Sequence, residues 1–175
     1  MAVMYANALY KRGFIKEGYK VLKNLLDSAM DFENSIMYPG IPEYFDNDGR
    51  GLYAYLTGAA SWYMLTMITE VFGVRGELGN LVIKPALLPE QFDKDGKAAI
   101  KLNFSGRTLK ITIHADIDNI QDNNGVYNKI IRVECDGNEL ESADLKKVVI
   151  MKKRIEEMSC ERCHEIDVFI KQYVR

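Results

Sequence analysis

The sequence is poor in the features that mark several large classes of protein. Its three cysteines do not make a paired disulfide framework, and an odd number suits a reducing compartment. A net charge of -2 offers no basic surface for nucleic acid, and no uninterrupted apolar run is long enough for a membrane-spanning helix. At the N-terminus the charges follow the apolar residues, unlike in a secretory signal. We expect a soluble, cytoplasmic protein that binds neither nucleic acid nor membrane.

The first half of the chain has the apolar spacing of helices. Residues 3–10, which Gly13 ends, and residues 15–30 predict a helical hairpin. Residues 52–72 are apolar on nearly every side, which predicts a third helix, buried in a core and stopped by glycines at 73 and 76. Three such helices cannot close a core alone, so this half is expected to need further helices or a partner surface.

The second half alternates between apolar and polar residues, as strands do. A connector with two of the four prolines is expected over residues 81–89. Gly106 supplies a turn between strands at 99–104 and 108–113. Further strands are expected at 130–135, 148–152 and 166–170. Turn signals at such short intervals predict an antiparallel sandwich, so that the chain divides into residues 1–76 and 77–175.

The most informative stretch of the sequence lies between residues 38 and 63. It combines prolines and glycines with aromatic rings and carboxylates, which suit the stacking and hydrogen bonding that sugars require. We interpret residues 38–51 as a substrate loop, whose expected sugar contacts are Tyr38, Glu43, Tyr44, Phe45 and Arg50. An ion pair between Glu43 and Arg50 that orders the loop is an equal alternative. Tyr53 and Trp62 are expected to pack in the core.

The same stretch resembles a known family. The resemblance is carried by Tyr-Pro-Gly-Ile-Pro-Glu-Tyr-Phe at 38–45, Tyr-Ala-Tyr-Leu-Thr-Gly-Ala-Ala-Ser-Trp-Tyr at 53–63 and Phe-Gly-Val-Arg-Gly at 72–76. These strings are similar to the C-terminal portion of glycoside hydrolase family 94, the cellobiose-phosphorylase-like enzymes and cyclic β-1,2-glucan synthases. The similarity runs from about Met4 to about Ile113. It implies an α+β fold, with the last helices of an (α/α)6 barrel followed by a small antiparallel β-sandwich.

The resemblance also implies a reaction. Inorganic phosphate would attack the anomeric carbon of a β-glucoside or oligoglucan while a carboxylic acid protonates the leaving oxygen, with inversion. The family's phosphate contacts fall on Thr57 and Gly58; the structural alternative is a helix-interior threonine and a small residue that lets another helix approach. Phosphate is the only co-substrate implied, with no cofactor or metal.

No residue of this sequence matches the family's general acid, so no catalytic residue is assigned. We expect the acid to lie upstream of this chain, which would be inactive without an upstream barrel segment or a second copy as partner. The predicted function is therefore the C-terminal portion of an inverting carbohydrate phosphorylase. The alternative is a non-catalytic carbohydrate-binding or interaction module.

One motif stands apart from this reading. Cys160-Glu-Arg-Cys163-His164 has the spacing of covalent haem attachment, and its thiols and imidazole are also zinc ligands. A redox pair would normally open a helix after a strand, and Ser159 is only a weak cap for one. An exposed turn with free thiols is the interpretation that the surrounding sequence favours.

Overall fold

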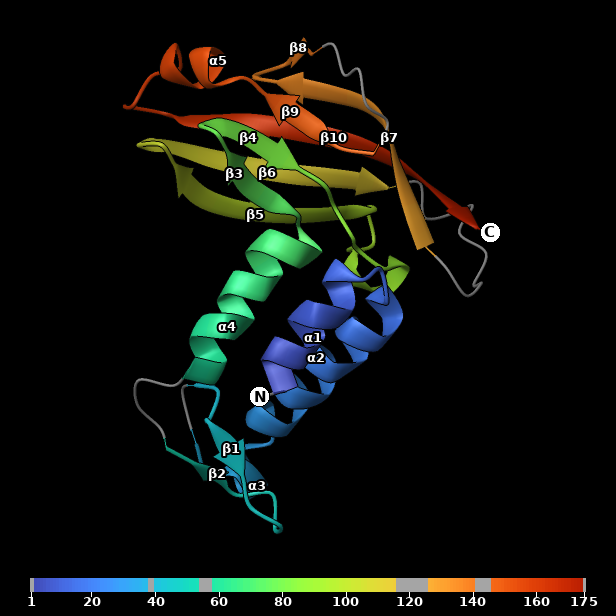
Figure 1. Cartoon of the computed structure of the whole chain (residues 1–175), viewed down its shortest axis with the longest axis vertical. Coiled ribbons are helices and arrows are strands. Elements are labelled where there is room, and N and C mark those ends of the chain that lie inside the picture. The colour runs from blue at the N-terminus through green and yellow to red at the C-terminus, as the bar shows by residue number, and fades with distance from the viewer. Residues whose placement is uncertain (1, 38–39, 54–57, 116–125, 141–145, 175) are drawn as a thin grey trace. The chain divides into compact units, whose positions relative to one another are not determined.

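The computed structural model describes residues 2–37, 40–53, 58–115, 126–140 and 146–174 (Figure 1). The chain divides into two compact units, Met1–Glu70 and Val71–Arg175. The first unit is mainly helical and the second is built from strands. The sequence placed this division after residue 76.

Two helices of the first unit are those that the apolar stripes predicted. They are α1 (Ala2–Lys11) and α2 (Ile15–Met30), and α1 packs against both α2 and α4 (Gly58–Thr66). The short connection between α1 and α2 passes through Gly13, whose φ of 83° is unfavourable for a residue with a Cβ atom. A short helix, α3 (Phe32–Ser35), follows α2.

The predicted helix over 52–72 is wrong in its start and in its burial. Leu52 belongs to strand β2, the described helix α4 begins at Gly58, and a π-helical segment (Met67–Val71) continues it. Only Ala59 and Thr66 of α4 are buried, whereas Met64 is 61 % exposed. The described residues cover only one side of α4, where the Asn7 amide donates a hydrogen bond of 3.2 Å to the Thr66 hydroxyl.

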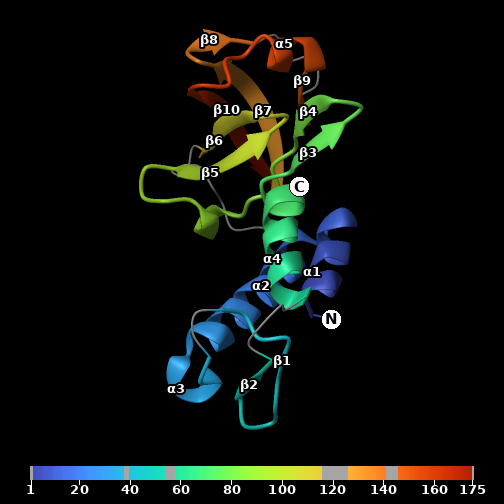
Figure 2. The ribbon, with the colours of Figure 1, turned by 90° about the vertical axis from the view of Figure 1, so that its left-hand side faces the viewer.

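The second unit contains two sheets (Figure 2). One has the order β3-β4-β9 and is formed by β3 (Val74–Glu77), β4 (Asn80–Ile83) and β9 (Val148–Ile150). The other has the order β5-β6-β10-β7-β8 and is formed by β5 (Lys97–Phe104), β6 (Arg107–Ala115), β7 (Val126–Cys135), β8 (Asn138–Glu139) and β10 (Cys163–Val174). A 3-10 turn (Pro89–Gln91) and α5 (Lys152–Glu156) complete the unit.

Alternating side chains of the strands form the core of the second unit. Leu109, Ile111 and Ile113 of β6 are fully buried, and Ile166 and Val168 of β10 are their neighbours across the sheet. The intervening residues of both strands lie on the opposite face. This period-two pattern is the one that the sequence displayed.

Three two-residue turns join neighbouring strands. Both residues have positive φ in Leu78-Gly79, in Ser105-Gly106 and in Asp136-Gly137, as type I′ turns require. The predicted hairpin around Gly106 is confirmed, whereas the hairpin β3–β4 occupies part of the stretch predicted to be a connector.

The predicted architecture is wrong in two respects. The described residues form five short α-helices and no ring of helices, which contradicts the assignment of an (α/α)6 barrel. The sandwich is not purely antiparallel either, because β10 pairs with β6 in parallel. Apolar alternation does not encode strand direction, and the long connection between these two strands permits a parallel return.

Candidate functional site

The predicted substrate loop folds as a small hairpin. Strand β1 (Tyr44–Phe45) pairs with β2 (Gly51–Leu52) in antiparallel register. Asp46 shapes the turn, since its carboxylate accepts the N–H groups of Asp48 at 3.0 Å and Arg50 at 2.9 Å. Its own N–H donates to the carbonyl of Arg50. Asp46 therefore acts as a turn residue.

The Glu43 carboxylate lies at the first turn of α4. Its Oε2 accepts the N–H of Ala59 at 3.0 Å, and a Cβ atom at Gly58 would lie 3.5 Å from its Oε1. A carboxylate at this position satisfies one of the free N–H groups of the helix and interacts favourably with the helix dipole. The contact joins the hairpin to α4. Sequence reasoning missed it because Ala59 contributes only a backbone group.

Two tyrosine rings lie together on the hairpin. The centroids of Tyr44 and Tyr53 are 5.4 Å apart with tilted planes, and the residues are 49 % and 58 % exposed. Desolvation and then a hydrogen bond with Tyr53 raise the pKa of Tyr44 above its ordinary value. The expectation that Tyr53 packs in the core is wrong; the residue has a positive φ of 61°, which directs the chain away from regular strand geometry.

The remaining predicted contacts have different outcomes. Tyr38 and Thr57 lie outside the described residues. Gly58 is the first residue of α4 and is exposed, Phe45 is half-buried, and Arg50 is exposed. No ion pair joins Glu43 to Arg50 among the described residues. The structure thus brings the Glu43 carboxylate to Gly58 at the start of α4, whereas Tyr44 contacts Tyr53.

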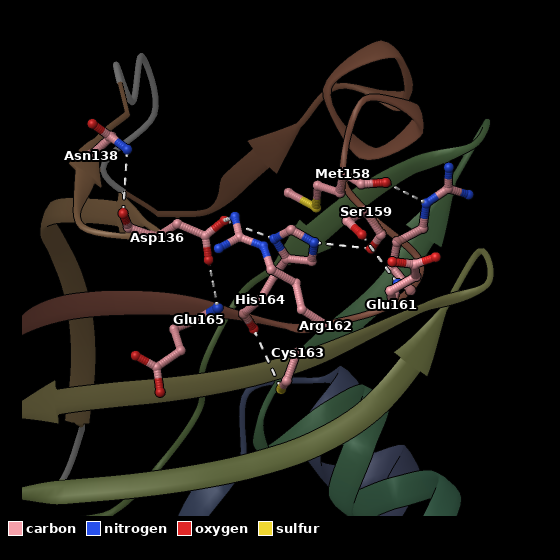
Figure 3. A network of polar contacts seen from close by, with 10 residues as sticks. Asp136, Asn138, Met158, Ser159, Glu161, Arg162, Cys163, His164 and Glu165 are labelled. Carbon is pink, nitrogen blue, oxygen red and sulfur yellow. Dashed lines mark hydrogen bonds and ion pairs between the residues drawn. The ribbon is translucent and has the colours of Figure 1, made fainter.

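A second polar cluster contains Glu161, Arg162, Cys163 and His164 of the Cys-x-x-Cys-His motif (Figure 3). His164 is 2 % exposed; its Nδ1 lies 2.7 Å from Asp136 Oδ2 and its Nε2 lies 3.0 Å from the carbonyl oxygen of Ser159. Cys160 and Cys163 are free and exposed. Because Cys163 and His164 are consecutive residues of β10, their side chains point to opposite faces.

This arrangement bears on the haem and zinc alternatives for the motif. Both ring nitrogens of His164 are occupied by protein oxygens, so the ring has no free nitrogen for a metal. The side chains described by the structure contain no group of three or more metal ligands.

The other histidine belongs to the opposite face of the larger sheet. Nε2 of His114 lies 2.6 Å from Asp167 Oδ1, and its ring stacks on Phe169 with the centroids 4.5 Å apart. The guanidinium of Arg132 covers Phe169, its centre 3.8 Å from the ring centroid. These contacts link three neighbouring strands and leave neither face of Phe169 for a sugar.

None of the helices within the described residues has the length and apolar character needed to cross a membrane. A scan against protein-family models gives no match to this chain, and a search of curated proteins finds none.

Proposed function

We propose that this chain supplies part of the sugar pocket of an inverting phosphorylase that acts on β-glucosides or oligoglucans. The observation that carries the proposal is the end of α4, where the Glu43 carboxylate and the exposed Tyr44 and Tyr53 rings lie on one small hairpin. Aromatic faces and carboxylates are the groups with which proteins hold the apolar and hydroxyl sides of a sugar ring. The resemblance to glycoside hydrolase family 94 supports the same reading.

The proposed reaction requires a nucleophile and an acid. A phosphate oxygen forms a bond to the anomeric carbon, the bond from that carbon to the leaving oxygen breaks, and a carboxylic acid transfers its proton to that oxygen. Asp46 and Glu43 are already engaged with backbone N–H groups. We therefore assign the acid to another polypeptide segment and no catalytic role to either residue.

Phosphate is the proposed co-substrate, with its contacts at Thr57 and Gly58. Glu43 bears on this assignment, because its carboxylate already accepts the N–H of Ala59 beside Gly58. A dianion and a carboxylate at the same helix terminus would repel each other. Phosphate binding in the complete site consequently requires Glu43 to turn toward the sugar or to be neutralised by a cation.

The exposed apolar side chains of the first unit support a partner for this chain. Among the described residues, fifteen large apolar side chains are exposed, and eleven of them belong to the first unit. Such a concentration is typical of a surface that another segment or a second copy covers. The free thiols of Cys160 and Cys163 are compatible with the reducing cytoplasm that we propose as its location.

A titration of the full chain with cellobiose, laminaribiose and β-1,2-linked glucose oligomers, followed by NMR, tests this proposal. We expect shifts at the hairpin and at Gly58, and a dissociation constant that rises about 2- to 13-fold in Tyr44→Ala, since an aromatic contact contributes about 0.5–1.5 kcal/mol. Tyr5→Ala is the matched control, because Tyr5 is 60 % exposed on α1. No binding, or equal loss in both variants, would contradict the proposed pocket.

The alternative is a non-catalytic carbohydrate-binding module. It is favoured by Glu43 and Asp46, whose carboxylates both accept backbone N–H groups and so have a structural role. The two functions differ in their response to phosphate. In the phosphorylase, phosphate should change sugar affinity once the remaining segment is supplied, and glucose 1-phosphate should form; in the binding module neither should occur.

A further inference from the structure

The buried histidine of the second unit faces two hydrogen-bond acceptors. Its Nδ1 lies against the carboxylate of Asp136 and its Nε2 against the carbonyl of Ser159, as Figure 3 shows. A neutral imidazole has one N–H, so it can satisfy only one of these acceptors. Both contacts are hydrogen bonds only if His164 carries hydrogen on both nitrogens, that is, if it is an imidazolium ion.

Asp136 cannot supply the missing hydrogen, because it is itself surrounded by donors. Arg162 Nη2 donates to its Oδ2 at 2.8 Å, and the N–H of Glu165 donates to its Oδ1 at 3.1 Å. Burial opposes ionisation, but the hydrogen bonds from His164 and from the Glu165 backbone, with the charges of His164 and Arg162, lower the pKa of Asp136. The carboxylate is therefore ionised, and the pair consists of two opposite charges.

The other charged groups around the pair come from neighbouring elements. Arg162 precedes β10, and Arg154 of α5 interacts with the buried thiol of Cys135, next to Asp136. Glu165 directs its carboxylate to Lys110 of β6, at 3.1 Å. The cation on His164 is thus balanced by Asp136, the carboxylate that contacts its ring, and loss of the ring's charge would leave Asp136 paired with Arg162.

The contact to Ser159 is the one that depends on the second hydrogen. A carboxylate is a stronger acceptor than a peptide carbonyl, so a neutral His164 keeps its hydrogen on Nδ1 for Asp136 and loses the one on Nε2. The Ser159 carbonyl then faces a lone pair. The segment on either side is anchored independently, because Arg107 donates to the carbonyls of Glu156 and Met158, while Cys163 pairs with β6.

We propose that Asp136, His164 and the Ser159 carbonyl form a proton-controlled latch on residues 159–162. While His164 is protonated the latch is closed and the turn that carries Cys160 is fixed against β10. When the proton leaves Nε2, the turn separates from the ring and the surroundings of the exposed Cys160 thiol change. The device is independent of the sugar pocket, which lies in the first unit.

NMR of the 15N-labelled full chain between about pH 5 and pH 9 tests the latch. At the acidic end both ring nitrogens of His164 should carry hydrogen. As the ring loses its proton, amide exchange at residues 160–162, corrected for its intrinsic pH dependence, should increase about 2- to 13-fold, which corresponds to one hydrogen bond of about 0.5–1.5 kcal/mol. The amides of residues 166–168 should not change.

Two variants and a control separate the latch from a purely structural pair. His164→Gln keeps a donor toward Ser159 that cannot titrate, so the pH dependence at 160–162 should disappear. Asp136→Asn should abolish it too, because an amide N–H can donate to Nδ1 and leave the hydrogen of a neutral ring on Nε2. His114→Gln alters the only other histidine and should leave the response intact.

Three results would overturn the proposal. The first is a His164 ring that holds a single hydrogen at the acidic end. The second is a ring that titrates with no change at residues 160–162. The third is a pH response that persists in Asp136→Asn, the variant that tests the latch if His164→Gln does not fold.

Discussion

Glu43→Ala should weaken the first turn of α4. The substitution removes the acceptor of the Ala59 N–H, a part-buried hydrogen bond of 3.0 Å. Loss of such a helix cap typically costs about 1–2 kcal/mol. Glu43→Gln keeps an oxygen acceptor and loses only the charge, whose interaction with the helix dipole contributes about 0.3–1 kcal/mol and is screened by salt. The alanine variant should therefore be the less stable of the two.

The chain provides its own reporter for this measurement. Trp62 is the only tryptophan and belongs to α4, so its fluorescence during urea unfolding follows the first unit. With a slope of about 2 kcal/mol/M, the alanine variant should shift the midpoint by about 0.5–1 M. Asp48→Ala, which removes an exposed carboxylate from the same hairpin, is the control and should change stability by less than about 0.5 kcal/mol. Equal midpoints for the two alanine variants would refute the capping role of Glu43.

Two further predictions concern the second unit. Gly73→Ala should destabilise the second unit by about 2–5 kcal/mol in urea unfolding, because φ is +68° and the new Cβ would lie 1.8 Å from the Lys84 carbonyl oxygen. The control is Gly106→Ala, at φ +75° with no atom within 4 Å of the new Cβ, which should cost only about 1–2 kcal/mol. Similar losses in the two variants would show that the backbone shifts to remove the contact with Lys84. Folding lowers the pKa of Asp136, so this group stabilises the folded state above its ordinary pKa of about 3.9, and the stabilisation is lost as pH falls through the lower folded value. The loss of unfolding free energy in acid should therefore be smaller in Asp136→Asn than in the natural sequence. Identical acid profiles for the two proteins would contradict this.

The sequence predicted local elements better than their assembly. The stripe of α2 and the alternation around Gly106 each depend on spacing within one element, and both elements are present. Spacing could not predict the start of α4. Apolar residues occupy both strand β2, which contains Leu52, and helix α4, which contains Met64, so apolar character does not mark the boundary between them. The parallel pairing of β6 with β10 depends on residues far apart in the sequence, which no local pattern records.

The candidate site shows the same division. Glu43 and Tyr44 were singled out from residue type, and the structure places the Glu43 carboxylate beside Gly58. The Ala59 N–H has no signature in the side-chain sequence, and Tyr53 was assigned to the core because an aromatic residue near an apolar helix usually packs there. The latch was missed because Asp136 and His164 come together only through the pairing of β7 with β10.

The three type I′ turns have a consequence for the order in which the second unit folds. A hairpin closed by two residues with positive φ forms from its own sequence and requires no distant partner, so β3–β4, β5–β6 and β7–β8 can form early. The parallel pair is different, since Thr108 must find Cys163 across the whole of β7, β8, β9 and α5. Closing so long a loop is entropically slow. We therefore expect insertion of β10 between β6 and β7 to limit the folding rate, and until it occurs both strands present open edges to other chains.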